Sequence, residues 1–519
     1  MAAEIAPSLR SRWFAEAARD VQLTRFMLLR GLGFIYLVGF LIVIGQGLPL
    51  LGERGLLPIG VFLSRLRESG ESASVAFWAA PSLFWLSSSD AMFQALAWLG
   101  GALSLGVLLG LDSAVVMLAL WAIYGSFVHV GQIFYGYGWE MLLLEAGFLG
   151  VFLAPLRPRL AWVAPGQARS VPPLVAIWLY RWLLFRVMLG AGLIKLRGDD
   201  CWRDLTCLVY HYETQPNPHP LSWLWHQLPP WWHAIGVLAN HAAELVVPFG
   251  VFGPRRLRHI AGACTVVFQT ALILSGNLSF LNWLTIVVAL ACFDDSLWSR
   301  LLPGQLVAAV ADANAAPLGR AARGVSLALA LLIGVLSLEP TLNLLGPDQR
   351  MNAGFDPLHL VNTYGAFGSI SRERNEIVLE GALGPADARE EELAWKELEL
   401  PCKPVDPERA PCWITPYHYR LDWQMWFAAL GRPERQIWLL SFVHQLLTGS
   451  LGARSLLSHD PFEGVAPTWV RASYYRYELT GFGEPGWWRR TRLGSYLPAL
   501  RRDDPRLLGA LERFGLADR

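Results

Sequence analysis

Repeated apolar stretches of about 20 residues constrain this chain more than any other feature of its sequence. An α-helix needs about 20 apolar residues to cross the hydrocarbon core of a bilayer, which is about 30 Å thick. Such stretches lie near 26–48, 91–111, 113–131, 138–155, 173–195, 233–253, 257–275, 277–293 and 323–340. With 54% hydrophobic and 16% charged residues, the composition is also wrong for a soluble protein of 519 residues. The sequence therefore predicts a mainly α, polytopic helical membrane bundle of about nine spans over residues 1–340.

The distribution of arginine predicts how these spans are oriented. Cytoplasmic loops of membrane proteins are enriched in Lys and Arg. Arginines precede the first span and recur in the loops assigned to the same side: Arg10, Arg12, Arg19 and Arg25, then Arg157, Arg159 and Arg169, then Arg255, Arg256 and Arg258, then Arg300, Arg320 and Arg323. This pattern places the N-terminus inside, where residues 1–20 are expected to form an amphipathic helix and not a cleavable signal. An odd number of spans then places residues 341–519 outside.

Residues 341–519 differ in pattern from the bundle and predict a separate, extracytoplasmic α+β domain. Short β-type runs at 361–367, 375–379, 395–400 and 474–479 predict a small, β-sandwich-like sheet. Two helical stretches, 419–430 and 435–448, interrupt these runs. The chain also has three lysines against forty arginines, a bias typical of a GC-rich genome. The expected location is therefore a bacterial inner membrane, with this domain on its outer side.

Ionisable residues inside or beside the apolar stretches are the strongest candidates for function. Charged groups within a bilayer are costly unless they pair with one another or face a polar cavity. Glu140 and Glu145 lie in one predicted span and Arg181 and Arg186 in another, so we expect Glu145 to pair with one of these arginines. The remaining candidates could converge on the outer mouth of a cavity between the spans. They are Lys195 at the end of the 173–195 span, His211, Tyr212 and Glu213 in the loop after it, and His241 and Glu244 in the 233–253 span. The set either holds the bundle together or lines a functional polar cavity.

A charged loop with two cysteines follows the span that contains the two arginines. Its candidate residues are Asp200, Cys201, Trp202, Arg203, Asp204 and Cys207. A disulfide is awkward within a continuous helix but possible in a loop, because bridged Cα atoms lie about 5.5 Å apart. A reactive thiol pair is the alternative, although the spacing is not that of a CxxC redox motif. The nearby His and Glu residues lack a short ligand spacing such as HExxH, so no metal site is predicted.

The C-terminal region contains a second cysteine pair, and the sequence lacks the common cofactor-binding motifs. Cys402 and Cys412 enclose a proline-rich segment, and in an extracytoplasmic domain a disulfide between them is the natural interpretation, with two free buried thiols as the alternative. The sequence has no Gly-rich phosphate loop, GxSxG motif or dinucleotide fingerprint, so no cofactor is predicted. The net charge of +1 provides no field that would attract nucleic acid.

Several long segments resemble the lipase maturation factor family. They are VMLGAGLIK (187–195), RGDDCWRDLTC (197–207), HYETQPNPHP (211–220), AELVVPF (243–249), SGNLSFLNWLT (275–285), MNAGFDPLHLVNTYGAFGSI (351–370), CKPVDPERAPC (402–412) and ITPYHYRLDW (414–423). The resemblance covers roughly residues 136–500. It implies a chaperone-like membrane protein, not an enzyme, that helps secreted lipases of the lipoprotein-lipase type to fold and dimerise.

The resemblance also sets the expected partners. Well-studied family members lie in the endoplasmic reticulum membrane, with a link to thiol redox there, and their extracytoplasmic C-terminal domain would contact the client. The expected partners are thus membrane lipids and a secreted client protein. The family supplies no established catalytic residues, and nothing in this sequence looks like the catalytic apparatus of a lipase.

An alternative function comes from a second likeness. ERGLLP (53–58) and the multi-span layout resemble the polytopic superfamily that includes the vitamin-K-dependent carboxylase. The alternative is a membrane-embedded enzyme that uses the Glu/Arg/His cavity on a lipid, a quinone or a secreted peptide. A chaperone-like factor needs an exposed apolar or edge-strand surface on residues 341–519, whereas an enzyme needs a pocket where the charges meet. A scaffold whose buried charges only hold the bundle together is a third possibility.

Overall fold

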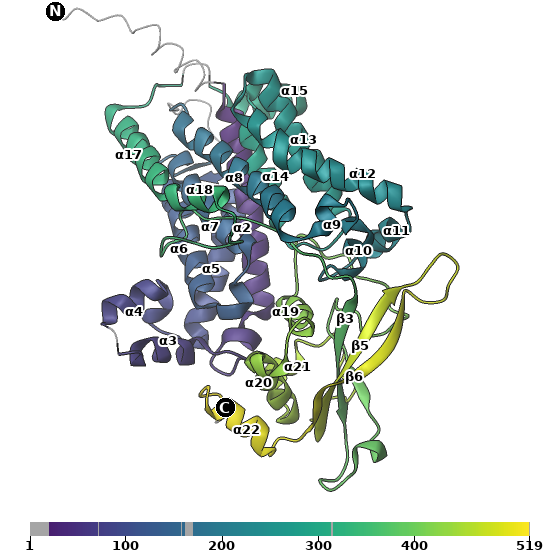
Figure 1. The fold of residues 1–519 in the computed structure, drawn as a ribbon. Helices are drawn as coiled ribbons and strands as arrows, with labels where there is room; N and C mark the ends of the chain where they lie inside the picture. Colours follow the sequence, from purple (N-terminus) through teal and green to yellow (C-terminus); the bar gives the residue numbers. More distant parts are fainter. Residues whose placement is uncertain (1–19, 71, 157, 161–169, 313–314, 518–519) are drawn as a thin grey trace, which may run out of the picture.

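The computed structural model describes residues 20–70, 72–156, 158–160, 170–312 and 315–517. The amphipathic helix expected at 1–20, apart from its last residue, and the loop residues Arg157 and Arg169 lie outside this described part of the chain. The described chain is mainly helical, with a small antiparallel sheet near its C-terminal end (Figure 1).

Helix α2 (Gln22–Leu51) lies at the centre of the bundle. Its sequence is apolar on every side, which is typical of a helix enclosed by others. Of its most apolar 18 residues, 67% are buried, against 22% for the segment Arg320–Leu345 (α17 and α18) at the periphery. Three helices pack directly along α2: α5 (Asp90–Leu108), α7 (Gly138–Leu153) and α14 (Leu281–Ala289) (Figure 1). The aromatic ring of Tyr124 in α6 (Ala114–Val130) also contacts α2, and α8 (Leu174–Gly198) packs on α7 and α14.

The described helices confirm a multi-span bundle but not the predicted number of nine spans. Five helical segments are long and apolar enough to cross a membrane: α2, α5, α8, Pro230–Phe252 (α12, η3 and η4) and Arg320–Leu345. A sixth is possible if Leu281–Cys292 and Asp295–Leu301, which meet at 116°, form one broken span. The other predicted spans coincide with α6 and α7, which have 17 and 16 residues, and with α13 (Arg255–Ile273), which begins with three arginines in four residues.

Shorter elements surround the ends of the bundle. Near the end of α2 that leads into Gly52 lie α3 (Ile59–Glu68), α4 (Ala73–Ala79) and η1 (Leu83–Trp85). The loop after α8 forms α9 (Asp200–Arg203), α10 (Cys207–Thr214) and α11 (Pro220–His226). This loop lies close to the sheet in Figure 1, which is why its residues can contact the C-terminal part of the chain.

The sheet contains four antiparallel strands in the order β4-β3-β5-β6. They are β3 (Arg374–Ala382), β4 (Lys396–Leu398), β5 (Trp469–Leu479) and β6 (Trp488–Leu500). Three predicted runs are confirmed as strands, but the run at 361–367 is wrong because that segment is a loop. Within the described C-terminal residues, no second sheet packs on this one as a sandwich would require.

Two helices connect this sheet with the bundle. α19 (Arg420–Ala429) and α20 (Ile437–Leu447) confirm the predicted helical stretches. Figure 1 shows them between the bundle and the sheet, with α22 (Pro505–Glu512) below α20. Their buried side chains belong to the same hydrophobic core as those of α2 and α7. The C-terminal region is therefore packed into the bundle and is not a loosely tethered unit.

Candidate functional site

The predicted ion pair between two spans joins Glu145 in α7 to Arg186 in α8. Both side chains are only 1% exposed, and Arg186 Nη2 donates to Glu145 Oε1. The other carboxylate oxygen accepts hydrogen bonds from the Asn362 backbone N–H (3.1 Å) and the Tyr364 hydroxyl (2.7 Å). Arg186 Nη1 donates to the Asn362 carbonyl at 2.6 Å. Segment 361–367 is not a strand because backbone groups in it bond to the bundle instead of to a neighbouring strand.

Glu140, at the start of α7, binds a residue much farther along the chain. Arg420 Nη2 lies 2.9 Å from Glu140 Oε1, and neither side chain is more than 1% exposed. The Tyr124 hydroxyl (2.5 Å) and the Trp139 indole N–H (3.1 Å) also donate to the Glu140 carboxylate. The Arg420 guanidinium lies 3.5 Å from the centre of the Tyr135 ring. Because Arg420 is the first residue of α19, these contacts fix that helix against the bundle.

Lys195 and Glu244 form a third buried pair. Lys195 Nζ donates to the two Glu244 carboxylate oxygens at 2.6 and 2.7 Å, and to Asn240 Oδ1 at 3.0 Å. Asn240 Nδ2 in turn donates to Glu244 at 2.9 Å. Glu244 lies in the π-helical turn η3 (Ala242–Val246), an irregularity that often occurs at functional sites. The Lys195 ammonium group and the Glu244 carboxylate are nevertheless bonded to each other, so neither charge is left unpaired.

Two further candidates bond to backbone carbonyls. Arg181 Nε donates to the Ala291 carbonyl at 2.8 Å, so Arg186 is the arginine that pairs with Glu145. His241 Nε2 lies 3.0 Å from the Trp202 carbonyl. Neither side chain points its polar group toward the Glu145 carboxylate, so these residues do not extend that set into a larger cavity.

The three consecutive candidates of α10 face different neighbours. His211 packs on the Phe367 ring at 4.9 Å, and burial beside the charge of Lys195 lowers its pKa to about 4. Burial raises the pKa of Tyr212 to about 12. Glu213 accepts a hydrogen bond from the Leu479 N–H of β5 at 2.8 Å, and burial raises the pKa of its carboxyl group. The ten predicted polar residues thus form several separate sets of contacts and do not line one cavity.

The cysteine-bearing loop contains a disulfide between Cys201 and Cys207. Helix α9 ends at Arg203, and the positive φ of 59° at Leu205 interrupts the chain before α10 begins. The two Cα atoms are consequently 4.8 Å apart. Asp200 forms an exposed ion pair with Arg203, Asp204 follows the end of α9, and Trp202 packs near Lys195. The segment between the two cysteines is therefore looped, which is the geometry in which the sequence allowed a bridge.

Asp199, the first acidic residue of this loop, caps α9. Its carboxylate accepts hydrogen bonds from Arg372 (2.8 Å) and from the Cys201 N–H (3.0 Å), and the bond from Arg372 is the main reason why its pKa falls to about 2. Asp199, Cys201 and Cys207 place potential metal-ligand atoms within 4.8 Å of one another. The sulfur atoms are bonded to each other and Arg372 occupies the carboxylate, so these residues do not offer three free ligands.

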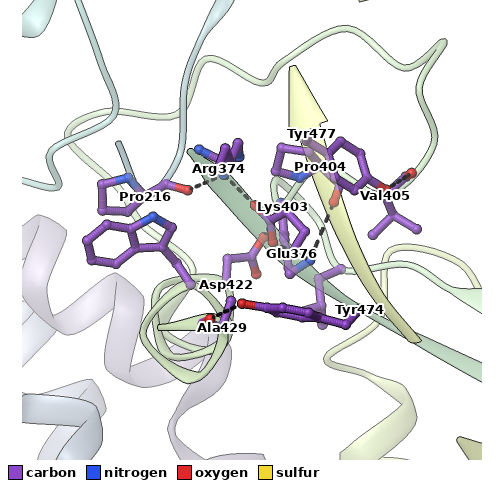
Figure 2. Close-up of polar contacts among 12 residues, drawn as sticks. Pro216, Arg374, Glu376, Lys403, Pro404, Val405, Asp422, Ala429, Tyr474 and Tyr477 are labelled. Atoms are coloured by element: carbon purple, nitrogen blue, oxygen red, sulfur yellow. Dashed lines mark hydrogen bonds and ion pairs between the residues drawn. The ribbon is translucent and has the colours of Figure 1, made fainter. Parts of the chain in front are cut away.

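The second predicted bridge, between Cys402 and Cys412, is also present, with its Cα atoms 5.4 Å apart. Beside it lies a buried charge cluster that the sequence did not reveal, consisting of Arg374, Glu376, Lys403 and Asp422 (Figure 2). Arg374 Nη2 and Lys403 Nζ each lie 2.6 Å from a carboxylate oxygen of Glu376. Arg374 and Glu376 are two residues apart on β3, so they share one face of the strand.

This cluster links the sheet to the loop after α8. Arg374 donates to the carbonyls of Glu213 (2.8 Å), Gln215 (2.5 Å) and Pro216 (3.0 Å), at and just beyond the end of α10. Asp422 Oδ1 accepts hydrogen bonds from the Cys402 and Lys403 N–H groups, both at 2.6 Å. Burial raises the pKa of Asp422 to about 6 and lowers the pKa of Lys403. A charged pair on one strand face is typical of an exposed strand, so nothing in the sequence indicated burial.

Comparison with known proteins identifies the family of this chain. The family model for the lipase maturation factor transmembrane domain matches residues 23–300, more than half of the chain. The chain belongs to the lipase maturation factor family. A second model of the family, for the lipase maturation factor C-terminal domain, matches residues 360–498. No solved structure matches the chain.

Individual relatives within the lipase maturation factor family are similar over nearly the whole chain. The chain is 48% identical to lipase maturation factor 1 of Bos taurus over 510 residues, which cover 93% of this chain and 90% of the relative. The chain is 44% identical to lipase maturation factor 1 of Homo sapiens, and the match covers 93% of this chain and 89% of the relative. It is 31% identical to human lipase maturation factor 2, and this match covers 96% of the chain and 85% of the relative. The predicted family resemblance is confirmed, and with it a multi-pass membrane protein.

The buried charges connect the two matched regions of this chain. Glu145 and Arg186 lie in the transmembrane region and bind Asn362 of the C-terminal region. Glu140 binds Arg420, and the carbonyls after α10 bind Arg374. Three separate polar connections therefore hold the C-terminal region in one position on the bundle.

Proposed function

We propose that this protein is a membrane-embedded maturation factor that assists the folding of secreted proteins, with lipase-type clients. The support is the family itself, since its relatives are named lipase maturation factors. In this proposal the client meets the C-terminal region on the extracytoplasmic side. The protein would act by holding a folding intermediate near the membrane and not by catalysing a reaction.

The observation that carries the proposal is the exposed edge of the C-terminal sheet. β6 lies at the end of the strand order, so one side of it has no strand partner among the described residues. A free edge offers backbone N–H and C=O groups to a strand of another chain. Leu493 is 44% exposed, and β6 also exposes Arg489, Thr491, Arg492, Ser495 and Pro498. Arginine and proline on an edge limit self-association, which suits a surface that binds clients transiently.

The membrane-enzyme alternative has less support from the geometry. An enzyme would need its charged groups to meet in an accessible pocket. Glu145, Arg186, Glu140 and Arg420 are each at most 1% exposed and are bonded to one another or to the C-terminal loops. These contacts are those expected of groups that hold the two regions together.

The finer topology is part of the proposal. We place nine spans in the membrane by counting α6, α7, α13 and the broken segment that contains α14 with the five longer helical segments. The N-terminus is placed inside, and residues 341–519 are placed outside as the client-facing domain. Both disulfides then lie on the oxidising side, where such bonds persist. The arginine-rich composition favours a bacterial inner membrane for this chain. The endoplasmic reticulum membrane is the location that the family resemblance implies for eukaryotic relatives.

A complementation assay tests the proposal. The chain would be produced in human cells that lack lipase maturation factor 1, and the activity of a secreted lipase would be measured. We expect the unaltered chain to restore activity, Leu493→Asp on β6 to reduce it, and Val465→Asp, a similarly exposed apolar residue away from the strand edge, to leave it intact. A folded, membrane-inserted chain that restores no lipase activity would overturn the proposal.

A further inference from the structure

An apolar pocket lies beside α6, apart from the buried charges described above. Its volume is about 310 Å³, at the lower end of the range for small-molecule pockets. Nine of its thirteen lining residues are apolar or aromatic: Phe77, Pro81, Leu83, Trp85, Leu86, Trp121, Ala122, Leu144 and Leu358. The pocket is formed by α4, η1, α6, α7 and the loop before Asn362, and it contains none of the ten predicted polar residues.

The hydroxyl groups in the pocket wall are already used. Ser82 Oγ donates to the Ser126 carbonyl at 3.0 Å. Ser126 Oγ donates to the Ala122 carbonyl at 2.7 Å and accepts from the Leu83 N–H at 2.9 Å. His129 is the titratable residue of the lining, and its ring stacks on His359 with 5.0 Å between the ring centres. A polar, water-soluble ligand would therefore find few hydrogen-bond partners in this pocket.

Exposed apolar residues of α6 lie on the helix turns that precede its pocket-lining residues. Val115 and Leu118 are 64% and 47% exposed. Ala122, Gly125 and His129 follow them at alternating steps of four, three and four residues, so all five lie on one face of the helix. A hydrocarbon chain lying along this face of α6 would contact apolar side chains from Val115 to the pocket lining.

We propose that this pocket holds one acyl chain of a membrane phospholipid. The tail would lie along the Leu118 to Gly125 face of α6, and the ester end would lie near His129, in the last turn of that helix. Eleven residues separate Leu118 from His129, or about 16 Å at 1.5 Å per residue, which is close to half of the hydrocarbon core of about 30 Å. The apolar lining, the exposed apolar residues of α6 on the preceding turns and the polar residue at one end all match such a chain.

A filling variant with a matched control separates this site from general lipid contact. A Cβ atom at Gly125 would meet only Leu144 Cδ2, at 3.5 Å, so Gly125→Leu projects into the pocket without a backbone clash. Gly106 in α5 does not line the pocket, and its Cβ would come equally close, 3.5 Å, to Leu111 Cδ2. Gly106→Leu is therefore the control. Ala122→Phe fills the same pocket if Gly125→Leu fails to fold.

The test is photo-crosslinking in vesicles of phosphatidylethanolamine and phosphatidylglycerol that contain a phospholipid with a diazirine in its acyl chain. We expect labelling to concentrate on peptides 77–86 and 121–129 of the full chain. Gly125→Leu or Ala122→Phe should lower that labelling about tenfold, equivalent to about 1.4 kcal/mol of binding, while Gly106→Leu leaves it unchanged. Labelling spread evenly over the membrane-facing helices, or labelling of these peptides only by a diazirine fatty acid, would overturn the proposal.

Discussion

Replacing Arg186 by Met should destabilise the protein by about 3–5 kcal/mol, because it leaves the buried Glu145 carboxylate without its counter-charge. The environment supports a cost of that size, since both side chains are 1% exposed. Methionine keeps an apolar side chain of similar length beside Trp182. The loss of stability would therefore come from the missing charge and hydrogen bonds of Arg186, and not from lost packing. Glu145 keeps its bonds from Asn362 and Tyr364, but the Asn362 carbonyl loses its donor.

The double variant Glu145→Gln/Arg186→Met separates the charge imbalance from the lost contacts. It removes both charges and should recover most of the stability, since an uncharged replacement of a buried pair is often close to neutral. Contacting residues of this kind are coupled by about 0.5–3 kcal/mol. Arg203→Met is the control, because its ion pair with Asp200 is exposed and such pairs contribute about 0–1 kcal/mol.

Thermal unfolding in mild detergent, followed by tryptophan fluorescence, measures these differences. A loss of about 3–5 kcal/mol corresponds to a fall in Tm of about 3–5 °C, because the entropy of unfolding grows with chain length. We expect the wild type and Arg203→Met to have the highest Tm, the double variant a lower Tm, and Arg186→Met the lowest. The reasoning is refuted if Arg186→Met melts with the wild type, or if the double variant is less stable than Arg186→Met alone.

Three further predictions concern the C-terminal region. Arg420→Met should loosen α19 and speed tryptic cleavage within 431–436, whereas Arg489→Met, which loses an exposed pair with Glu484, should not; equal cleavage would argue against the Glu140 contact. The pKa of Asp422 is raised to about 6 from its ordinary 3.8, so its contribution to stability is full below about pH 4 and is lost as pH rises through about 6. Asp422→Asn should abolish that part of the pH dependence of Tm, and an unchanged pH profile would contradict the assignment. Replacing Cys402 and Cys412 by Ser should cost about 2–3 kcal/mol for a loop closed at a separation of 10 residues, and non-reducing peptide mapping that found free thiols in the wild type would count against both bridges.

The membrane bundle was predictable because span length and hydropathy are properties of single segments. The bilayer sets the helix length, so α2, α5 and α8 follow directly from their apolar runs. The number of spans was harder to predict, because α6 and α7 are short and α13 begins with arginines. Strands β3, β4 and β5 were found from their β-type runs, whereas β6 was missed because its four charged or polar residues at 489–492 interrupt the apolar pattern.

The buried charges were predictable within the spans but not outside them. An ionisable residue in an apolar run must find a partner, so the pair of Glu145 with one of two arginines could be anticipated. Its other partners, Asn362 and Tyr364, lie in a segment whose alternation looked like a strand. Arg420, Arg374 and Lys403 occur in segments of ordinary polarity, so their burial depends on long-range packing that no local pattern encodes.

The most direct test of the proposed function is to ask what the free sheet edge contacts in a living cell. A photoreactive amino acid would be placed at position 493 on β6, or at position 118 on the membrane face of α6, in cells that produce a secreted lipase. The account predicts that irradiation joins the newly made lipase to position 493 and not to position 118. A lipase captured at neither position, or equally at both, would contradict the claim that the C-terminal sheet receives the client.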